Sequence, residues 1–369
     1  MTGTGAGLAG LLNGLLGGIA AAVMGGLAGL SGGEGIDTAR LMQPDPAPTL
    51  SAYHLFVGGE ARTPAPGLVP YSLNTPLFTD YALKSRWLYL PPGTQLRYAG
   101  AGLPEFPVGS VLVKTFSYPT DLRRPTVGVH PVETRLLIRK PDGWAASTYV
   151  WNAAGTEAVL KRAGARLPVH VIDRAGQALD IDYGVPNVNQ CKTCHSVEGR
   201  LSPIGPKARN LNGPLEAVPG GENQLARMSR LGVLAGAPAP AAVPRTAVWD
   251  DPAEPLTDRA RAYLDGNCGH CHSPQGFASN SGLYLELEQK DMSAVGVGKR
   301  PVAAGRASGG LSFAIAPGDP DHSILVYRMA STEPGVMMPQ LGRSLVHAEG
   351  LALVRAYVAS LRDDPAPRH

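Results

Sequence analysis

The cysteines and histidines of this chain form one short pattern twice. Cys191-Lys-Thr-Cys194-His195 and Cys268-Gly-His-Cys271-His272 share the spacing CxxCH and use all four cysteines of the 369 residues. Two thiols at this spacing can add to the two vinyl groups of one haem, while the histidine that follows binds the iron. The repeat therefore predicts two covalently bound haem c groups, attached to Cys191, Cys194, Cys268 and Cys271, with His195 and His272 as iron ligands.

Other uses of paired cysteines fit this spacing less well. A zinc ribbon places its two CxxC pairs about 15–20 residues apart, whereas a much longer stretch separates Cys194 from Cys268. A thioredoxin-like pair follows an apolar strand and opens a helix, but the second pair here ends a helical pattern. His270 lies inside the second motif and cannot easily turn back to the same iron. We expect its side chain to face solvent.

A methionine near the C-terminus is the candidate sixth ligand of the second iron. Met338 occurs in Gly335-Val-Met-Met-Pro339, where the turn before a proline can present a thioether rigidly. Ligation by histidine and methionine raises the reduction potential of a haem. Met337 is the alternative ligand, and filling an apolar gap is the commoner role of a methionine.

The sixth ligand of the first iron is less clearly indicated. Met228 is one candidate, although it lies on the apolar stripe of an expected helix, where core packing suits it equally well. His130 or His170, reaching over from the preceding region, is another. A five-coordinate iron is the third alternative, and it would leave this site open to a substrate.

The residues before the first motif predict a β-rich domain from 50 to 185. Gly and Pro turns recur there among short stretches of β-branched and aromatic residues with partly alternating polarity, which is typical of an antiparallel sheet. We expect strands at 110–117, 133–139 and 147–151, and we expect the core of the sheet to contain Trp87, Trp144 and Trp151.

The first motif belongs to a shorter segment, from 186 to 234. This segment is polar and loop-like around the motif and has helical spacing of its apolar residues at 222–234. Residues 235–247 are rich in Pro and Ala and are typical of a linker. They are the predicted boundary before the second motif.

Residues 248–369 have the order of elements expected of a cytochrome c domain. A helix at 256–267 leads into the second motif, and another at 346–361 closes the chain. We expect Tyr263 and Tyr357 to pack where these helices cross. The predicted fold is multidomain α+β, in which an antiparallel β-rich N-terminal domain and a small haem segment precede an α-helical, class I-like cytochrome c domain.

Residues 1–49 are typical of an export segment, or signal peptide, followed by a tether. The stretch 7–31 is apolar and uncharged, although no basic residue precedes it, and the prolines of 43–50 oppose helix formation. No later apolar run is long enough to cross a membrane. The net charge of +3 and the absence of long Lys/Arg runs argue against a nucleic-acid partner.

Taken together, the chain resembles bacterial periplasmic dihaem c-type cytochromes that have a β-rich N-terminal region. The resemblance covers about residues 50 to 361. It implies haem attachment at both motifs, a methionine ligand from the Met337–Met338 pair and a periplasmic location, but no substrate. The stretches that carry it are 71–91, 106–116, 133–139, 186–195, 203–212, 260–272 and 317–343.

Three functions are compatible with these features. The first is electron transfer by two haems between an unknown periplasmic donor and acceptor. The second is a dihaem oxidoreductase of the peroxidase kind, with an open first iron. In the third, the chain accepts electrons from a dehydrogenase that docks on the β-rich domain, for which the candidate docking residues are Arg123, Arg124, Arg135 and Arg139.

Overall fold

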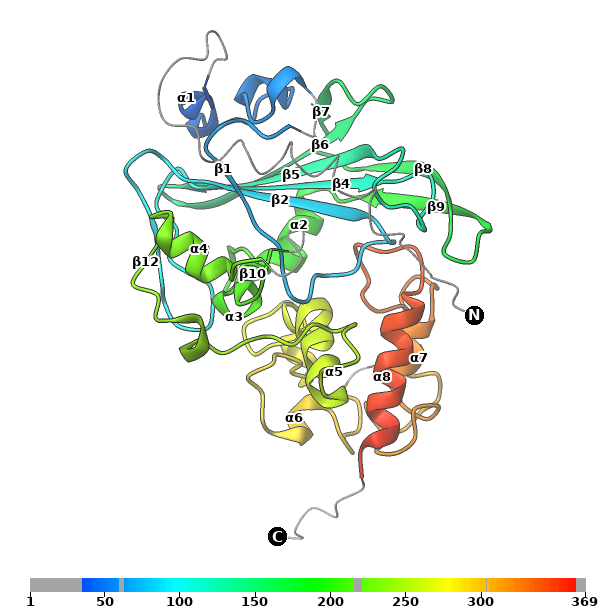
Figure 1. The fold of residues 1–369 in the computed structure, drawn as a ribbon. Helices are drawn as coiled ribbons and strands as arrows, with labels where there is room; N and C mark the ends of the chain where they lie inside the picture. The colour runs from blue at the N-terminus through cyan, green and yellow to red at the C-terminus, as the bar shows by residue number, and fades with distance from the viewer. Residues whose placement is uncertain (1–34, 60–62, 216–220, 303, 363–369) are drawn as a thin grey trace, which may run out of the picture. The chain divides into compact units, whose positions relative to one another are not determined.

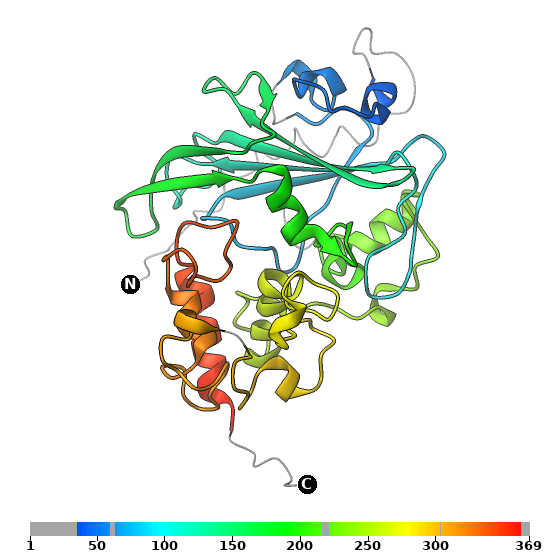
Figure 2. The ribbon, with the colours of Figure 1, turned by 180° about the vertical axis from the view of Figure 1, so that it is seen from behind.

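The computed structural model describes residues 35–59, 63–215, 221–302 and 304–362. Residues 1–34, which include the predicted leader, lie outside the described residues. From Gly35 to His369 the chain forms one compact unit. A β-sheet runs through this unit, with the N-terminal helix α1 on one face and the later helices on the other (Figures 1 and 2).

The central sheet has six strands in the order β1-β2-β4-β5-β6-β7, and every neighbouring pair is antiparallel. The three stretches expected to be strands lie in β4, β5 and β6. The bounds are β1 Leu68–Pro70, β2 Leu83–Tyr89, β4 Val111–Tyr118, β5 His130–Lys140, β6 Gly143–Trp151 and β7 Ala158–Leu160. A separate hairpin and two short pairs complete the β structure: β8 Ala165–Ile172 with β9 Ala178–Val185, β3 Leu96–Arg97 with β12 Leu234–Ala235, and β10 Ser196–Val197 with β11 Arg200–Leu201.

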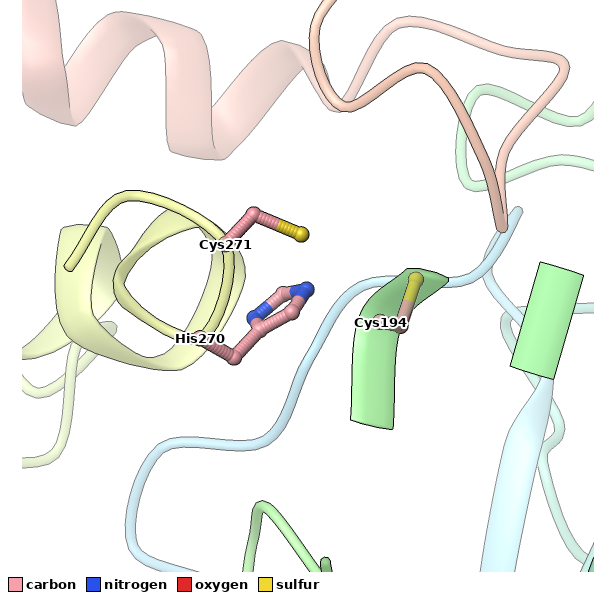
Figure 3. A group of neighbouring side chains, drawn as sticks. All are labelled: Cys194, His270 and Cys271. Carbon is pink, nitrogen blue, oxygen red and sulfur yellow. The ribbon is translucent and has the colours of Figure 1, made fainter. Parts of the chain in front are cut away.

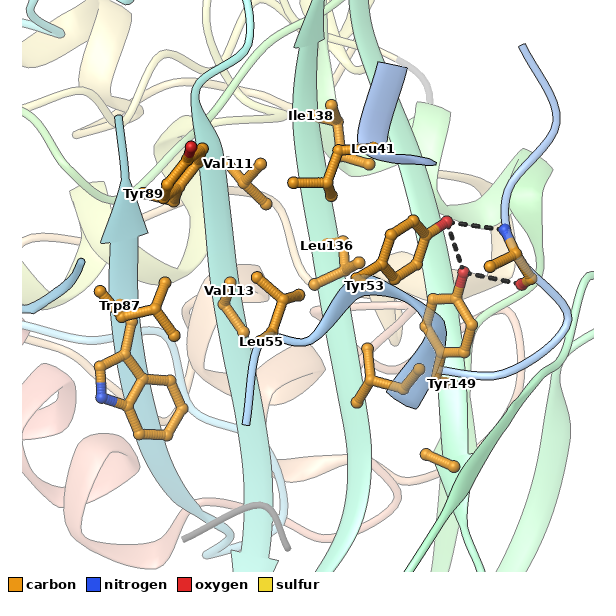
Figure 4. Close-up of a cluster of buried hydrophobic side chains, with 14 of the residues drawn as sticks. Leu41, Tyr53, Leu55, Trp87, Tyr89, Val111, Val113, Leu136, Ile138 and Tyr149 are labelled. Carbon is orange, nitrogen blue, oxygen red and sulfur yellow. Dashed lines mark hydrogen bonds between the residues drawn. The ribbon is translucent and has the colours of Figure 1, made fainter. Parts of the chain in front are cut away.

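One face of the sheet packs under the N-terminal segment. Successive residues of a strand point to opposite faces of the sheet. The side chains that point toward the N-terminal segment are buried and apolar (Figure 4). The hydroxyls of Tyr53 and Tyr149 bond each other at 3.0 Å and pair with the backbone of Ala47, so burying them leaves no polar atom unsatisfied. The expected tether at 43–50 is thus held against the sheet through Ala47 and Leu50. The central side chains of this face are Trp87, Val113, Leu136, Tyr149 and Trp151.

The prediction of an α-helical, class I-like cytochrome c domain is wrong. The largest regular element is the antiparallel sheet, and only α8 among the described α-helices is longer than nine residues. Between the second motif and α8, glycines and prolines are closely spaced and oppose longer helices. Within the described residues no helix has both the length and the apolar character that crossing a bilayer requires. The helices are α1 Thr38–Met42, α2 Val188–His195, α3 Ala208–Leu211, α4 Gln224–Arg230, α5 Leu256–Leu264, α6 Met292–Val295, α7 Ile324–Ala330 and α8 Ala348–Ser360.

The loop between β1 and β2 joins the sheet to the helical part. Asn210 accepts a hydrogen bond from the backbone N–H of Thr75 at 3.0 Å, and the buried carboxylate of Asp80 accepts bonds from the backbone of Ser344 and Leu345, each at 2.8 Å. The expected linker is also packed, since Val243 and Ala247 within 235–247 are buried. Both motifs are therefore held on one continuous scaffold.

Helices α5 and α8 cross where Tyr263 meets Gly350. A Cβ atom at Gly350 would lie 2.3 Å from the hydroxyl oxygen of Tyr263, so the crossing needs glycine. We expect Gly350→Ala to lower the free energy of unfolding by about 1–3 kcal/mol, the usual cost of overpacking. In a Tyr263→Ala background the same change should instead stabilise the protein, by about 1 kcal/mol, because alanine is the better helix former. Urea unfolding of the four proteins tests this, and equal effects in both backgrounds would contradict it.

Candidate functional site

Both CxxCH motifs open onto one cavity of about 690 Å³ between the sheet and the helical part. This volume is in the range of sites that bind organic ligands and cofactors. Strands β2, β4, β5 and β6 supply one wall, α2 and the following loop supply another, and the residues around the second motif and α7 supply the rest. The structure thus brings together all six motif residues that the sequence predicts as cofactor ligands: Cys191, Cys194, His195, Cys268, Cys271 and His272.

The first motif forms the C-terminal part of α2. Asn187 caps this helix, because its side chain accepts a bond from the backbone N–H of Gln190 and the Gln190 side chain accepts one from Asn187 in return. Cys191 and Cys194 follow on the helix and are half-buried. The imidazole Nδ1 of His195 lies 2.9 Å from the carbonyl oxygen of Ser202.

The second motif continues directly from α5. The chain passes through a wider, π-helical turn at Asp265–Gly269, which carries the buried Cys268. Nδ1 of His272 lies 3.2 Å from the hydroxyl oxygen of Ser281, and the carbonyl of His272 accepts a bond from the N–H of Leu285. Backbone and side chain of His272 are therefore both held in place.

The two histidines are held alike. When Nδ1 carries the proton and donates it to an oxygen, Nε2 keeps a free lone pair for a metal. Nε2 of neither His195 nor His272 has a hydrogen-bond partner among the described residues. Burial lowers the pKa of each imidazole to about 4, so both rings are neutral at neutral pH. Each ring is suited to bind iron through Nε2.

Met338 lines the cavity, whereas Met337 is not among its lining residues. The backbone of Met338 is fixed at both ends: its N–H donates to the carbonyl of Arg328 at 2.9 Å, and its carbonyl accepts a bond from the Arg343 guanidinium at 2.7 Å. Met329 of α7, which stands in no recognisable ligand motif, also lines the cavity.

None of the candidates for the first iron lines the cavity. Met228 is buried on the apolar face of α4, packed with Leu211 and Leu225 in a core cluster. His170 is exposed and its Nδ1 lies 2.6 Å from a carboxylate oxygen of Asp180. His130 lies at the start of β5 with its ring against the exposed 128–130 turn. Met228 thus belongs to a core cluster, and neither His130 nor His170 reaches the cavity.

The two motifs touch each other. Ligand atoms of Cys194, His270 and Cys271 all lie within 4.8 Å of one another (Figure 3). The neighbouring Cys271 thiol is the largest of the influences that lower the pKa of Cys194, to about 4, whereas Cys194 raises the pKa of Cys271. The expectation that His270 faces solvent is wrong, since its Nδ1 is buried without a hydrogen-bond partner among the described residues. The first motif covers the side of the second on which His270 lies.

Charged side chains in the wall are mostly cationic. Among the described residues, five cations and one carboxylate line the cavity: Arg86, Lys114, Arg135, Lys207 and Arg328, with Asp265 as the carboxylate. Arg135, expected on a docking surface, therefore faces the cavity instead, where it pairs with the buried Glu133. Sequence alone did not reveal this group, because its members come from different strands and helices.

No protein-family model, curated protein or solved structure matches this chain. The resemblance to dihaem c-type cytochromes therefore depends on the motifs and on the stretches around them.

Proposed function

We propose that this protein binds two haem c groups covalently in the shared cavity and transfers electrons. The observation that carries the proposal is the convergence of both CxxCH motifs on one cavity, where Nε2 of His195 and of His272 has no hydrogen-bond partner among the residues that the structure describes. Bound haem would supply a reversible one-electron change at iron. The cysteines would hold each porphyrin and the histidines would fix the iron beneath it.

Charge and donor type in the cavity support the same cofactor. Each haem carries two propionate groups, and the excess of cations in the wall offers counter-charges for them. Met338 offers a thioether, a soft donor that suits haem iron opposite histidine. Apolar side chains elsewhere in the wall, such as Leu285 and Leu325, would limit access of water.

The setting of the protein follows from this cofactor. We propose that the chain is exported to the periplasm, because the family that it resembles attaches haem there. Its donor and acceptor would be other redox proteins rather than nucleic acid. The docking surface for a dehydrogenase cannot include Arg135, which points into the cavity.

A catalytic role is the second candidate, favoured by one observation. None of Met228, His130 and His170 lines the cavity, so these three leave the sixth position of the first iron unfilled. An open iron can bind peroxide. Steady turnover of hydrogen peroxide by the reduced protein would favour this dihaem oxidoreductase, whereas two low-spin haems without turnover would favour electron transfer alone.

The mass of the purified, denatured protein tests the cofactor. After expression with haem-attachment machinery, we expect the polypeptide mass plus two haems. The double variants Cys191→Ala/Cys194→Ala and Cys268→Ala/Cys271→Ala should each retain one haem, because a porphyrin attached to the remaining pair is not lost on denaturation.

His270→Ala is the matched control for this experiment. It should keep both haems, since His270 is not the histidine that follows either cysteine pair. A colourless protein that binds zinc, and loses it in His270→Ala, would refute the proposal and assign Cys194, His270 and Cys271 to a metal site with three N and S ligands.

A further inference from the structure

A row of three cations crosses the sheet on its cavity side. Arg86 of β2 pairs directly with Lys114 of β4, which pairs with Arg135 of β5, which pairs with Thr148 of β6. All four residues line the cavity. Their chain neighbours Trp87, Val113, Leu136 and Tyr149 point the other way, into the core shown in Figure 4. We call Arg86, Lys114 and Arg135 the cationic row.

Such a row is unfavourable without anions beside it. Directly paired residues on neighbouring strands have Cβ atoms about 4.5–5.5 Å apart, and like charges at that distance repel. Burial lowers the pKa of Lys114, with the charges of Arg86 and Arg135 adding to the effect. Two apolar clusters flank the row on the same face, one around Leu112 and one around Phe116.

Within the row, Lys114 has no direct ion pair with a described residue. Arg135 forms a two-point ion pair with Glu133, whose second oxygen also accepts a bond from Tyr183. Nζ of Lys114 makes no hydrogen bond or ion pair with any described residue, and its contact is the ring of Phe116 at 4.7 Å from the centroid. The amine of Lys114 is therefore available to an anion in the cavity, whose charge would favour the protonated form of this side chain.

The first motif lies next to this row. Burial raises the pKa of the Cys191 thiol, while the charge of Arg135 and a hydrogen bond with Thr148 oppose the rise, which places that thiol beside the end of the row. The charge of Lys114 likewise acts on His195. A group attached to Cys191 and bound by His195 would bring its own substituents to the row.

We propose that the cationic row binds the propionate carboxylates of the haem attached at Cys191 and Cys194, and that Lys114 raises the reduction potential of this haem. The inference rests on the proposed function. Reduction adds one negative charge to the haem, so a nearby cation favours the reduced form. Lys114 is a positioning residue in this scheme and does not bind the iron.

Potentiometric titration of Lys114→Met, with both haems attached, tests the role of the row. We expect one of the two one-electron waves to fall by about 59 mV, which corresponds to a tenfold smaller equilibrium constant for reduction. The other wave should not move, and the low-temperature magnetic resonance spectrum should be unchanged. Lys114→Arg, which keeps the charge, should restore most of the potential. Lys161→Met, at an exposed position, is the control for the loss of one lysine.

Three results would overturn the inference. An unchanged pair of waves would mean that the row does not act on either haem. A change of spin state would assign Lys114 as an iron ligand instead. If Lys114→Met does not fold, Lys114→Gln replaces it in the titration. Equal potentials in wild type and Lys114→Gln would then overturn the inference. Absence of covalent haem from the wild-type mass would refute the proposed function itself, whereas attached haem with unmoved potentials would refute only the row.

Discussion

Replacing Arg209 with methionine is expected to lower the free energy of unfolding by about 3–5 kcal/mol, the cost of leaving a buried charge unpaired. The Arg209 side chain is 2% exposed and binds Asp265, which is 5% exposed, through two bonds of 2.9 Å. Nε of Arg209 also contacts Glu288 at 2.7 Å. The pair connects α3, beyond the first motif, to the turn that carries Cys268.

Urea unfolding measures this effect, and Arg230→Met provides a matched control. Arg230 pairs with Glu222 at 2.6 Å, but both side chains are well exposed. Exposed pairs contribute about 1 kcal/mol or less. If Arg209→Met and Arg230→Met lower the free energy of unfolding equally, the buried pair stabilises the fold no more than the exposed pair does.

The same variant should change how stability depends on pH. Burial alone would raise the pKa of Asp265, but the charges of Lys207 and Arg209, together with hydrogen bonds, lower it overall. A carboxyl group with a lowered pKa stabilises the fold above its ordinary pKa of about 3.9, and this contribution disappears as the pH falls through the pKa of the folded state. We expect Arg209→Met to lose less stability than wild type over that acidic range.

Replacing Met338 with alanine is expected to convert the haem at the second motif from low-spin to high-spin. Met338 lines the cavity and its backbone is fixed on both sides, so its thioether can be presented to iron without rearrangement. Loss of a methionine ligand also lowers the potential of a haem. Near-infrared magnetic circular dichroism separates the two states, and half of the total haem should change.

Met337→Ala serves as the control, because Met337 does not line the cavity. The Met337→Ala variant should keep the near-infrared dichroism band of methionine-ligated haem. If Met338→Ala remains low-spin while Met329→Ala loses that signature, the ligand is Met329 of α7 and the assignment of Met338 is wrong.

Local patterns predicted the elements of this fold better than their arrangement. The alternation around 133–139 and the apolar spacing of 346–361 indicated a strand and a helix where β5 and α8 occur. Short-range patterns do not determine which elements share a core. The packing of Val243 and the loop bonds of Asp80 join regions that the sequence suggested were separate domains. The helical cytochrome domain was wrong because most helices are short and the antiparallel sheet is the largest regular element.

The site could be predicted where its chemistry is contiguous in sequence. Both motifs are pentapeptides, so their residues were evident at once. The cationic row depends on the register between strands, which no local signal in Arg86 or Lys114 specifies. The position of His270 depends on the contact between two motifs that are distant in the chain.

That contact between motifs constrains how the protein must mature. The sulfur atoms of Cys194 and Cys271 lie within 4.8 Å, and a small movement would bring them to the distance of a disulfide bond. The lowered pKa of Cys194 favours its reactive thiolate. In an oxidising compartment, crosslinking would consume one thiol from each pair. Under the proposed function, haem attachment therefore requires that both thiols are kept reduced until the haem is bound.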